Sequence, residues 1–448
     1  MTGLKNSRQI VAEALLRMET ADGYSHIVLD HLLQSERSLT DRDRAFASVL
    51  FYGVLEKKLT LDSAISRYAS MPLRKMDALI RQLLRLGIYQ IVYLDSVPAS
   101  AAVNESVELA KRMGKKSAAG FVNGVLRAFL RDKGEIRLPD REKDPVGWLS
   151  LAYSVPRDLV KLWQNQYPDE NLEEMLRGLT GRAPLFARVN SCRTDAASLC
   201  RRLGEEGVEA REHPDFAGCI VLSHTGDLEK IPAFAQGLFH IQDLASQVCA
   251  AALGAEPGMR ALDCCAAPGG KTFTLAQQMA DQGEVVSGDL HESKVSLIRQ
   301  GAARLRLHSI RAVTADASVF RPELGQFDRV LCDVPCSGLG IIRRKPEIRY
   351  KPLDALAQLP PIQYKILETA AQYVKKGGLL LYSTCTLNRR ENEDLASRFL
   401  KEQPDFVPGQ FPAQVRRFLG GQEGGMATLM PHRNGTDGFF FALFSRQG

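Results

Sequence analysis

Long apolar runs are missing from this sequence. Although 45% of its 448 residues are hydrophobic, no run approaches the roughly 20 apolar residues of a membrane-spanning helix. The opening segment, residues 1–8, also has no apolar core of the kind that signal peptides carry. Internal repeats and low-complexity stretches are missing too. We therefore expect a monomeric, cytoplasmic protein of two or three globular domains that does not bind a membrane.

Paired cysteine motifs are also absent. The chain has nine cysteines, but it has no Cys-x-x-Cys and no Cys/His set with the spacing of a zinc site. The neighbours Cys264 and Cys265 do not suit a disulfide framework, so we expect reduced thiols in a cytoplasm and no bound metal. Four cysteines without chemical neighbours are interpreted as small buried hydrophobic residues, namely Cys192, Cys200, Cys219 and Cys249.

A glycine loop opens the C-terminal part of the chain. Residues 260–265 are predicted to form a strand, and an amphipathic helix is predicted to run up to Met279. Between them, Gly269 and Gly270 allow a ligand to approach the backbone at the start of a helix. The loop does not match a nucleoside triphosphate loop, because that motif requires glycine at the position of Cys265. The sequence thus favours another kind of ligand.

Aspartate ends several of the following predicted strands. A single aspartate at a strand end commonly only caps a helix or a turn. Three of them beside a glycine loop favour a nucleoside-bearing cofactor at the carboxyl ends of a doubly wound parallel sheet. The strands are 284–289, 311–316 and 327–333, and they end in Asp289, Asp316 and Asp333. A fifth strand, 378–382, follows a helix that is expected to contain Ile366, Leu367, Ala370 and Val374.

Two cysteines lie just past two of these strands. Cys336 follows Asp333 in the segment Asp-Val-Pro-Cys-Ser-Gly, and Cys385 follows the fifth strand in the segment Ser-Thr-Cys-Thr. Because the carboxyl ends of parallel strands share one crevice, both thiols should face the same pocket. A thiol in that place is a candidate nucleophile, and the alternative is a small buried hydrophobic residue.

The remaining sequence predicts two further domains. Residues 1–138 carry apolar side chains at helical spacing, and Thr40 is expected to cap a helix that begins at Asp41. A charged segment between two prolines, residues 139–145, marks a boundary. We predict an all-α domain at 1–138, a small α+β domain at 139–240, and an α/β domain at 241–448 that a hairpin ending in residues 439–444 closes.

Several of these motifs resemble those of the RNA cytosine carbon-5 methyltransferases, which use S-adenosyl-L-methionine. The similar segments are 263–272, 333–344 and 383–392. The helical N-terminus resembles the NusB-like domain of the RsmB type, the bacterial members that act on 16S ribosomal RNA. This resemblance covers nearly the whole chain. It implies a Rossmann-like methyltransferase domain preceded by an all-α NusB-like domain and by a small α+β connector that helps to bind RNA.

The resemblance also implies roles for individual residues. Cys385 would be the nucleophile, Cys336 would help to release the product, and Asp333 would contact the target cytosine and the edge of the cofactor. Asp289 would take the ribose hydroxyls of S-adenosyl-L-methionine, and Asp316 would lie at its adenine. The loop that would hold the cofactor comprises Cys265, Ala266, Ala267, Pro268, Gly269, Gly270 and Lys271.

Basic residues cluster immediately after the Cys336 turn. The net charge of the chain is only +6, but residues 299–351 hold 11 basic and 5 acidic residues. Beside a cytosine pocket, such a cluster is expected to bind RNA phosphates, and the alternative is an ordinary solvated surface. The expected RNA-binding residues are Arg343, Arg344, Lys345 and Arg349.

The sequence therefore predicts methylation of cytosine carbon 5 in RNA, with 16S ribosomal RNA as the expected substrate. A thiolate that adds to carbon 6 makes carbon 5 nucleophilic toward a methyl donor, which explains why a thiol is needed. The cytosine must be flipped out or single-stranded. Two alternatives stay open, a non-catalytic NusB-like RNA-binding assembly factor and a cytosine-5 methyltransferase that acts on transfer RNA, another ribosomal site or DNA.

Overall fold

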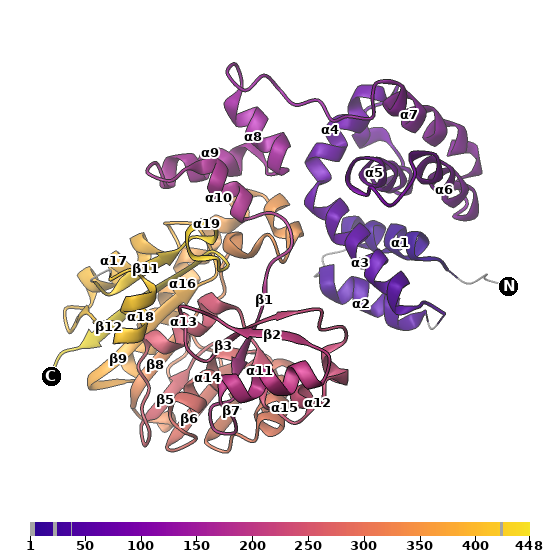
Figure 1. Ribbon diagram of the computed structural model, residues 1–448. Coiled ribbons are helices and arrows are strands. Elements are labelled where there is room, and N and C mark those ends of the chain that lie inside the picture. Colours follow the sequence, from indigo (N-terminus) through magenta and orange to yellow (C-terminus); the bar gives the residue numbers. More distant parts are fainter. Residues whose placement is uncertain (1–4, 21–24, 37, 422–423) are drawn as a thin grey trace. The chain divides into compact units, whose positions relative to one another are not determined.

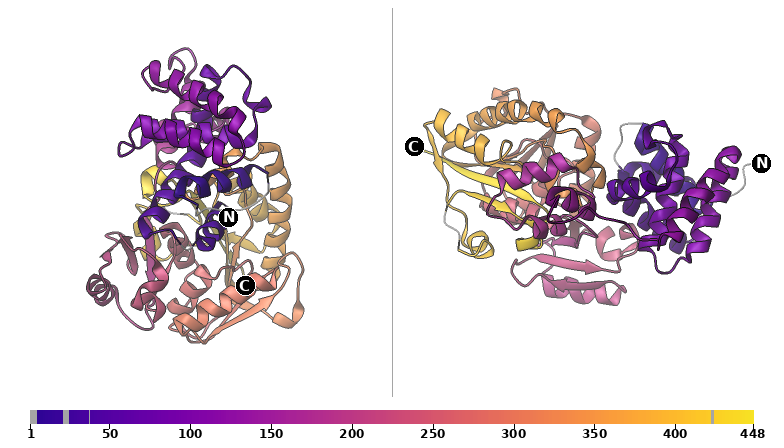
Figure 2. Two further views of the ribbon diagram at one scale, coloured as in Figure 1. Left: turned by 90° about the vertical axis from the view of Figure 1, so that its right-hand side faces the viewer. Right: turned by 90° about the horizontal axis from the view of Figure 1, so that it is seen from above.

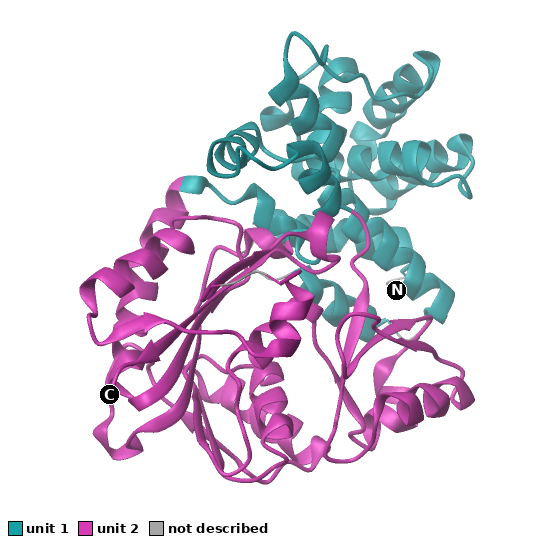
Figure 3. Cartoon of the chain, turned by 60° about the vertical axis from the view of Figure 1, so that its left-hand side comes forward, with its two compact units in different colours: residues 1–180, 342–353 teal, residues 181–341, 354–448 magenta. Residues whose placement is uncertain are grey.

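The computed structural model describes residues 5–20, 25–36, 38–421 and 424–448. Residues 1–4 lie outside the described residues. They are half of the opening segment that was expected to lack the apolar core of a signal peptide. The chain forms two compact units, which Figure 3 shows in two colours. One comprises residues 1–180 and 342–353, and the other comprises residues 181–341 and 354–448.

The N-terminal unit is built from helices, as predicted (Figures 1 and 2). The third of them begins as expected, because Thr40 accepts a hydrogen bond from the backbone of Asp43 and the Asp43 carboxylate accepts one from the backbone of Thr40. The first seven helices are α1 (Ser7–Thr20), α2 (Ser25–Ser35), α3 (Asp41–Glu56), α4 (Lys58–Tyr68), α5 (Ala78–Tyr93), α6 (Ala99–Arg112) and α7 (Ala119–Arg131). Three more follow, α8 (Pro145–Tyr153), α9 (Arg157–Gln166) and α10 (Leu172–Gly178).

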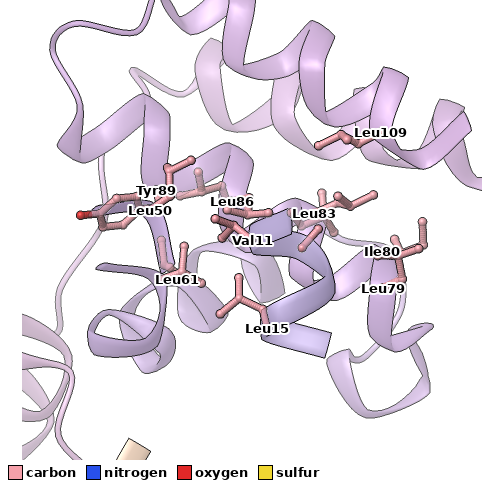
Figure 4. Packing of buried hydrophobic residues seen from close by; sticks show 14 of the residues in the cluster. Val11, Leu15, Leu50, Leu61, Leu79, Ile80, Leu83, Leu86, Tyr89 and Leu109 are labelled. Carbon is pink, nitrogen blue, oxygen red and sulfur yellow. The ribbon is translucent and has the colours of Figure 1, made fainter. Parts of the chain in front are cut away.

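Helix α5 forms the centre of this helical unit. Its side chains are buried over most of its circumference, which is typical of a core helix rather than a surface helix. Leu83 and Leu86 of α5 pack in one cluster with Val11 of α1 and Leu50 of α3 (Figure 4). The apolar periodicity that predicted the helices therefore also supplied the core.

The segment 342–353 belongs to this unit although it follows the Cys336 turn in sequence. Arg349 is only 1% exposed, and its guanidinium donates hydrogen bonds to the backbone carbonyls of Ile342 (3.1 Å) and Tyr153 (3.3 Å). The expectation that Arg349 binds RNA is therefore wrong, because a buried guanidinium bonded to carbonyls of its own chain offers no face to a phosphate. Arg343, Arg344 and Lys345 are partly exposed.

The second unit contains a large sheet in the order β10-β12-β9-β8-β5-β6-β7, with β11 paired to β12 (Figure 1). Strands β5 to β9 run parallel, and β12 is antiparallel to β9, so the predicted doubly wound α/β fold is confirmed. The parallel strands are β5 (Arg260–Asp263), β6 (Glu284–Asp289), β7 (Ile310–Thr314), β8 (Phe327–Asp333) and β9 (Val374–Thr384). The others are β10 (Phe406–Pro408), β11 (Met426–Leu429) and β12 (Phe439–Arg446), and the β11–β12 pair is the predicted C-terminal hairpin.

Helices cover both faces of this sheet. Alternate residues of one strand face opposite sides, so Val285 of β6 packs in one cluster with Leu275 of α14, whereas Val286 packs in another with Leu367 of α16. The helices are α13 (Leu244–Ala252), α14 (Gly270–Gln278), α15 (Glu292–Leu305), α16 (Leu359–Gln372), α17 (Glu393–Glu402), α18 (Ala413–Phe418) and α19 (Pro431–Asn434).

Two sequence boundaries in this sheet are corrected. Val374 begins β9 and does not belong to the preceding helix, since the strand starts four residues earlier than expected. Asp316 lies in the loop two residues beyond the end of β7 at Thr314. Neither change moves a strand terminus away from the edge of the sheet where the candidate site residues gather.

A small antiparallel sheet precedes the large one within the same unit. Its strand order is β2-β3-β1-β4, and it confirms the predicted α+β region. Its elements are β1 (Leu185–Val189), α11 (Ala196–Glu205), β2 (Glu209–Glu212), β3 (Cys219–Ser223), α12 (Pro232–Ala235) and β4 (Phe239–Ile241). The compact units divide after Thr180, so residues 139–180 cluster with the helical unit and the small sheet with the large one.

Candidate active site

The glycine loop connects β5 to α14 and makes a tight turn. Gly269, the residue before α14, has φ 111°, a conformation that side-chain-bearing residues rarely adopt. A Cβ atom at this position would lie 2.4 Å from the ring of Phe273. Glycine is therefore required here both by the backbone conformation and by the close packing of the loop against its own helix.

A pocket of about 200 Å³ lies against this loop. Its lining brings together most of the expected cofactor residues, which are Cys265, Ala266, Ala267, Pro268, Gly270, Lys271 and Asp333. Gly269 shapes the turn without lining the pocket. Asp289 and Asp316 do not line it either. Asp289 is the last residue of β6 and Asp316 lies two residues past the end of neighbouring β7, and the amide of Ala315 donates a 3.0 Å hydrogen bond to the carbonyl of Asp289.

Sequence reasoning missed four polar residues in the lining, Gln242, Asp243, Ser246 and Asp263. Asp263 is 1% exposed, one of its oxygens accepts a 2.7 Å hydrogen bond from Thr272, and burial raises its pKa to about 7. Gln242 is oriented by a 2.7 Å hydrogen bond that its Oε1 accepts from Thr274. Asp263 ends a strand, which was a usable signal, whereas nothing in the sequence marked Gln242.

The lining fits the amino-acid end of S-adenosyl-L-methionine. Among the described residues, Oδ1 of Asp263 and Nε2 of Gln242 are buried without hydrogen-bond partners. Buried polar atoms are normally paired, so an acceptor and a donor left open on one pocket suit a ligand that carries both kinds of group. An α-ammonium can donate to Asp263, and an α-carboxylate can accept from Gln242 and from the start of α14.

Lys271 and Asp333 form an ion pair beside this pocket. Lys271 Nζ lies 2.7 Å from Asp333 Oδ2, and Asp333 Oδ1 accepts a 2.7 Å hydrogen bond from Ser383 of β9. Burial, the largest single effect, lowers the pKa of Lys271, but the charge and hydrogen bond of Asp333, together with nearby Cys249 and Asp263, outweigh burial, so the pKa of Lys271 is raised. The pair fixes the Asp333 carboxylate between the glycine loop and the strand that leads to Cys385.

The two candidate thiols lie next to each other. Cys336 Sγ and Cys385 Sγ are 3.3 Å apart, at the turns that follow β8 and β9. The two turns are neighbours because β8 and β9 are paired, with Asp333 opposite Ser383. The hydrogen bond with Cys385, together with burial, raises the pKa of Cys336 well above its ordinary value. Cys336 therefore keeps its proton at neutral pH.

Two kinds of feature are absent from residues 5–20, 25–36, 38–421 and 424–448. No helix within them is both long enough and apolar enough to cross a membrane. They contain no cluster of three or more His, Cys, Asp or Glu side chains arranged to hold a metal ion.

Three family models match the chain, one for each predicted region. The model described as 16S rRNA methyltransferase RsmB/F matches residues 250–445, and the NusB family model matches residues 5–131. A third, described as the ferredoxin-like domain of RsmF/B-like methyltransferases, matches residues 155–229. These matches confirm the predicted fold class in each region.

Similar solved structures have the same fold. The crystal structure of PH0851 has a TM-score of 0.82 at 24% identity and covers 99% of both chains. The structure of NSun6 from Pyrococcus horikoshii with SFG has a TM-score of 0.58 at 19% identity, covering 65% of this chain and 98% of that one.

Curated relatives match over their full length. The probable ribosomal RNA small subunit methyltransferase B of Bacillus subtilis is 40% identical, over 98% of this chain and 99% of the relative. The ribosomal RNA small subunit methyltransferase B of Vibrio cholerae is 30% identical, over 99% of this chain and 98% of the relative. With its glycine loop, paired thiols and three matching domains, the chain belongs to the RsmB/F family of ribosomal RNA methyltransferases.

Proposed function

We propose that this protein transfers the methyl group of S-adenosyl-L-methionine to carbon 5 of a cytosine in 16S ribosomal RNA. The observation that carries the proposal is the pair of thiols, Cys336 and Cys385, held 3.3 Å apart at the strand ends beside the glycine-loop pocket. Methyl transfer to most heteroatoms needs no protein nucleophile. Carbon 5 of cytosine is a poor nucleophile and does need one, which a thiol can supply.

The first half of the reaction uses Cys385 and Asp333. The Cys385 thiolate adds to carbon 6 of the cytosine, and the electron pair of the C5–C6 double bond moves into the ring toward nitrogen 3. The charge that develops at nitrogen 3 needs a proton, which Asp333, held by Lys271 and Ser383, would supply in its protonated form. When bound, S-adenosyl-L-methionine supplies an electrophilic methyl group for carbon 5.

The second half of the reaction releases the product. The C5–H bond breaks, its electron pair restores the C5–C6 double bond, and the C6–S bond breaks with its electrons returning to Cys385. The proton passes to the thiolate form of Cys336 and afterwards to water. While Cys385 is bonded to carbon 6, burial still raises the pKa of Cys336, so its thiolate is a strong base but only a small fraction of it is present at neutral pH.

The proposed cofactor site extends from the pocket along the ends of the strands. Asp289 is 8% exposed at the end of β6 and would accept hydrogen bonds from the ribose hydroxyls. Asp316 would lie near the adenine, and its carboxylate is held in a turn by the amide (2.9 Å) and hydroxyl (2.7 Å) of Ser318. The similar NSun6 structure, determined with SFG, supports a small-molecule ligand in this fold.

RNA phosphates are proposed to bind the partly exposed cluster Arg343, Arg344 and Lys345. These three residues lie in the segment 342–353 of the helical unit. Arg349, which is buried, is not part of the proposed surface. The NusB family match of the same unit supports a role in RNA binding.

The test is bisulfite sequencing of 16S ribosomal RNA from cells that lack the protein. We expect one cytosine to lose its methylation and to regain it with the wild-type gene but not with Cys385→Ala. Restoration by Cys385→Ala would contradict the chemistry and favour an assembly role. Loss of methylation in transfer RNA instead of 16S ribosomal RNA would contradict the proposed substrate.

A further inference from the structure

Glu391 is a buried carboxylate that accepts four hydrogen bonds. It lies in the loop between β9 and α17 and is 0% exposed. Oε1 accepts from Ser337 Oγ (2.5 Å) and Asn388 Nδ2 (2.8 Å), and Oε2 accepts from the Ser337 amide (2.9 Å) and Gln363 Nε2 (2.8 Å). Removing a carboxylate from water costs free energy, and the four hydrogen bonds to Glu391 offset that cost while the donors keep this arrangement.

Most of these bonds hold the turn that carries Cys336. Ser337 directly follows Cys336 and donates to Glu391 through both its amide and its hydroxyl. Gln363 of α16 donates to Glu391 and also to the carbonyl of Pro335 (2.9 Å), the residue before Cys336. Glu391 therefore restrains the backbone on both sides of Cys336, on one side directly and on the other through Gln363.

The next residue, Asn392, holds the other thiol turn. Its Oδ1 accepts a 2.6 Å hydrogen bond from Thr384 Oγ1, and its Nδ2 donates a 2.9 Å hydrogen bond to the carbonyl of Thr386. Thr384 and Thr386 flank Cys385 in the chain. Two adjacent buried side chains thus each restrain one thiol turn, and a 2.6 Å hydrogen bond between the Ser337 and Thr386 hydroxyls joins the two turns.

We propose that Glu391 is a positioning residue for the release step, because it holds the Cys336 turn against the Cys385 turn, whereas Asn392 positions the nucleophile. This inference rests on the proposed function. The negative charge of Glu391 also raises the pKa of Cys336, although less than the hydrogen bond with Cys385, burial and the charge interaction with Cys385 do. A residue that positions Cys336 should act after methyl transfer, when the proton on carbon 5 must leave.

Matched isosteric variants separate the two roles. In Glu391→Gln the new amide group would face hydrogen-bond donors, so the Cys336 turn loses bonds while the Cys385 turn keeps Asn392. We expect single-turnover methyl transfer within about twofold of wild type but product release slowed by roughly tenfold to a hundredfold, the effect of losing a charged hydrogen bond. Asn392→Asp should show the reverse, with slow methyl transfer and no accumulated complex.

The measurement is denaturing gel electrophoresis of full-length protein incubated with cofactor and 16S RNA, beside quench measurements of methyl transfer. A retarded protein–RNA band from Glu391→Gln, removed when Cys385→Ala is added, would support the inference. Adding Glu391→Gln to Cys336→Ala should change the release rate little further, since both act on one step. If the double variant instead slows product release by the combined effect of both single changes, the inference would be overturned. Glu402→Gln, at an exposed residue that pairs with Arg398, is the control and should behave as wild type.

Folding is checked by thermal unfolding of each variant. If Glu391→Gln does not fold, Ser337→Ala removes the hydroxyl contacts to Glu391 and Thr386 but keeps the bond from the Ser337 amide to Glu391. A weaker retarded band from this variant would support the inference, and its absence would overturn it. If Cys336→Ala accumulates complex but the folded Glu391 variant does not, only this inference fails. If Cys336→Ala itself accumulates none, the proposed roles of the thiols fail.

Discussion

Replacing Cys336 by alanine should convert the enzyme into one that methylates once and then stays attached to its RNA. The change removes one partly buried sulfur that lies 3.3 Å from Cys385, so the void is small and the loss of folding free energy should be about 1 kcal/mol. The nucleophile remains, and methyl transfer should proceed. Removing a general base slows its step by roughly 10²–10⁴-fold, which sets the expected slowing of release.

The pH dependence of the wild-type enzyme provides a second measurement of the same role. The pKa of Cys336 is raised, so below that pKa the thiolate fraction grows about tenfold for each unit of pH. Product release should therefore accelerate as pH rises, and the steady-state amount of covalent complex should fall. Cys336→Ala should lose this dependence, because it has no thiol to ionise at that position.

The assay is denaturing electrophoresis with radiolabelled methyl donor and 16S RNA across a pH series. Cys336→Ala should give a retarded, labelled band with about one methyl group per enzyme. Cys385→Ala should give no such band and no labelled RNA. A band from Cys385→Ala with none from Cys336→Ala would reverse the two roles. No band from either folded variant, or a release rate in wild type that falls with rising pH, would refute the reasoning.

Three further predictions concern the cofactor, RNA and stability. Asp289→Ala should weaken S-adenosyl-L-methionine binding by about 1.5–3 kcal/mol, the usual effect of losing hydrogen bonds to a carboxylate, and unchanged affinity by calorimetry would remove Asp289 from the site. Alanine at Arg343, Arg344 and Lys345 together should weaken RNA binding and reduce its dependence on salt, because each lost phosphate contact removes a released counterion, and an unchanged salt slope would make the cluster an ordinary solvated surface. Burial raises the pKa of Asp263 to about 7 in the folded state, whereas the unfolded chain releases this proton near pH 4. The free energy of unfolding should therefore fall as the pH rises from about 4 to 7. Asp263→Asn should flatten that fall in urea-unfolding measurements, by a few kcal/mol at most.

The sequence by itself predicted much of the fold, because periodicity and turn chemistry are local properties. Four of the five parallel strands were predicted to within two residues of their observed bounds, whereas β9 starts four residues before the predicted strand. Thr40 was predicted as the helix cap it proves to be. The motif around the glycine loop indicated the pocket, since a strand, a glycine pair and a helix start are consecutive in the chain. The crevice shared by Asp333 and the two thiols followed from a general property of parallel sheets.

Tertiary structure decided what depends on residues far apart in the sequence. The basic cluster looked uniform in sequence. In the structure Arg349 is buried and donates a hydrogen bond to the carbonyl of Tyr153, whereas residues 343–345 are partly exposed. Glu391 lies in the motif segment 383–392, but the sequence assigned it no role, because its hydrogen-bond donors include Ser337, 54 positions earlier in the chain. Gln242 likewise became part of the pocket only through its place beside the loop. Burial and hydrogen bonding depend on which distant segments pack together, and a local pattern does not specify those partners.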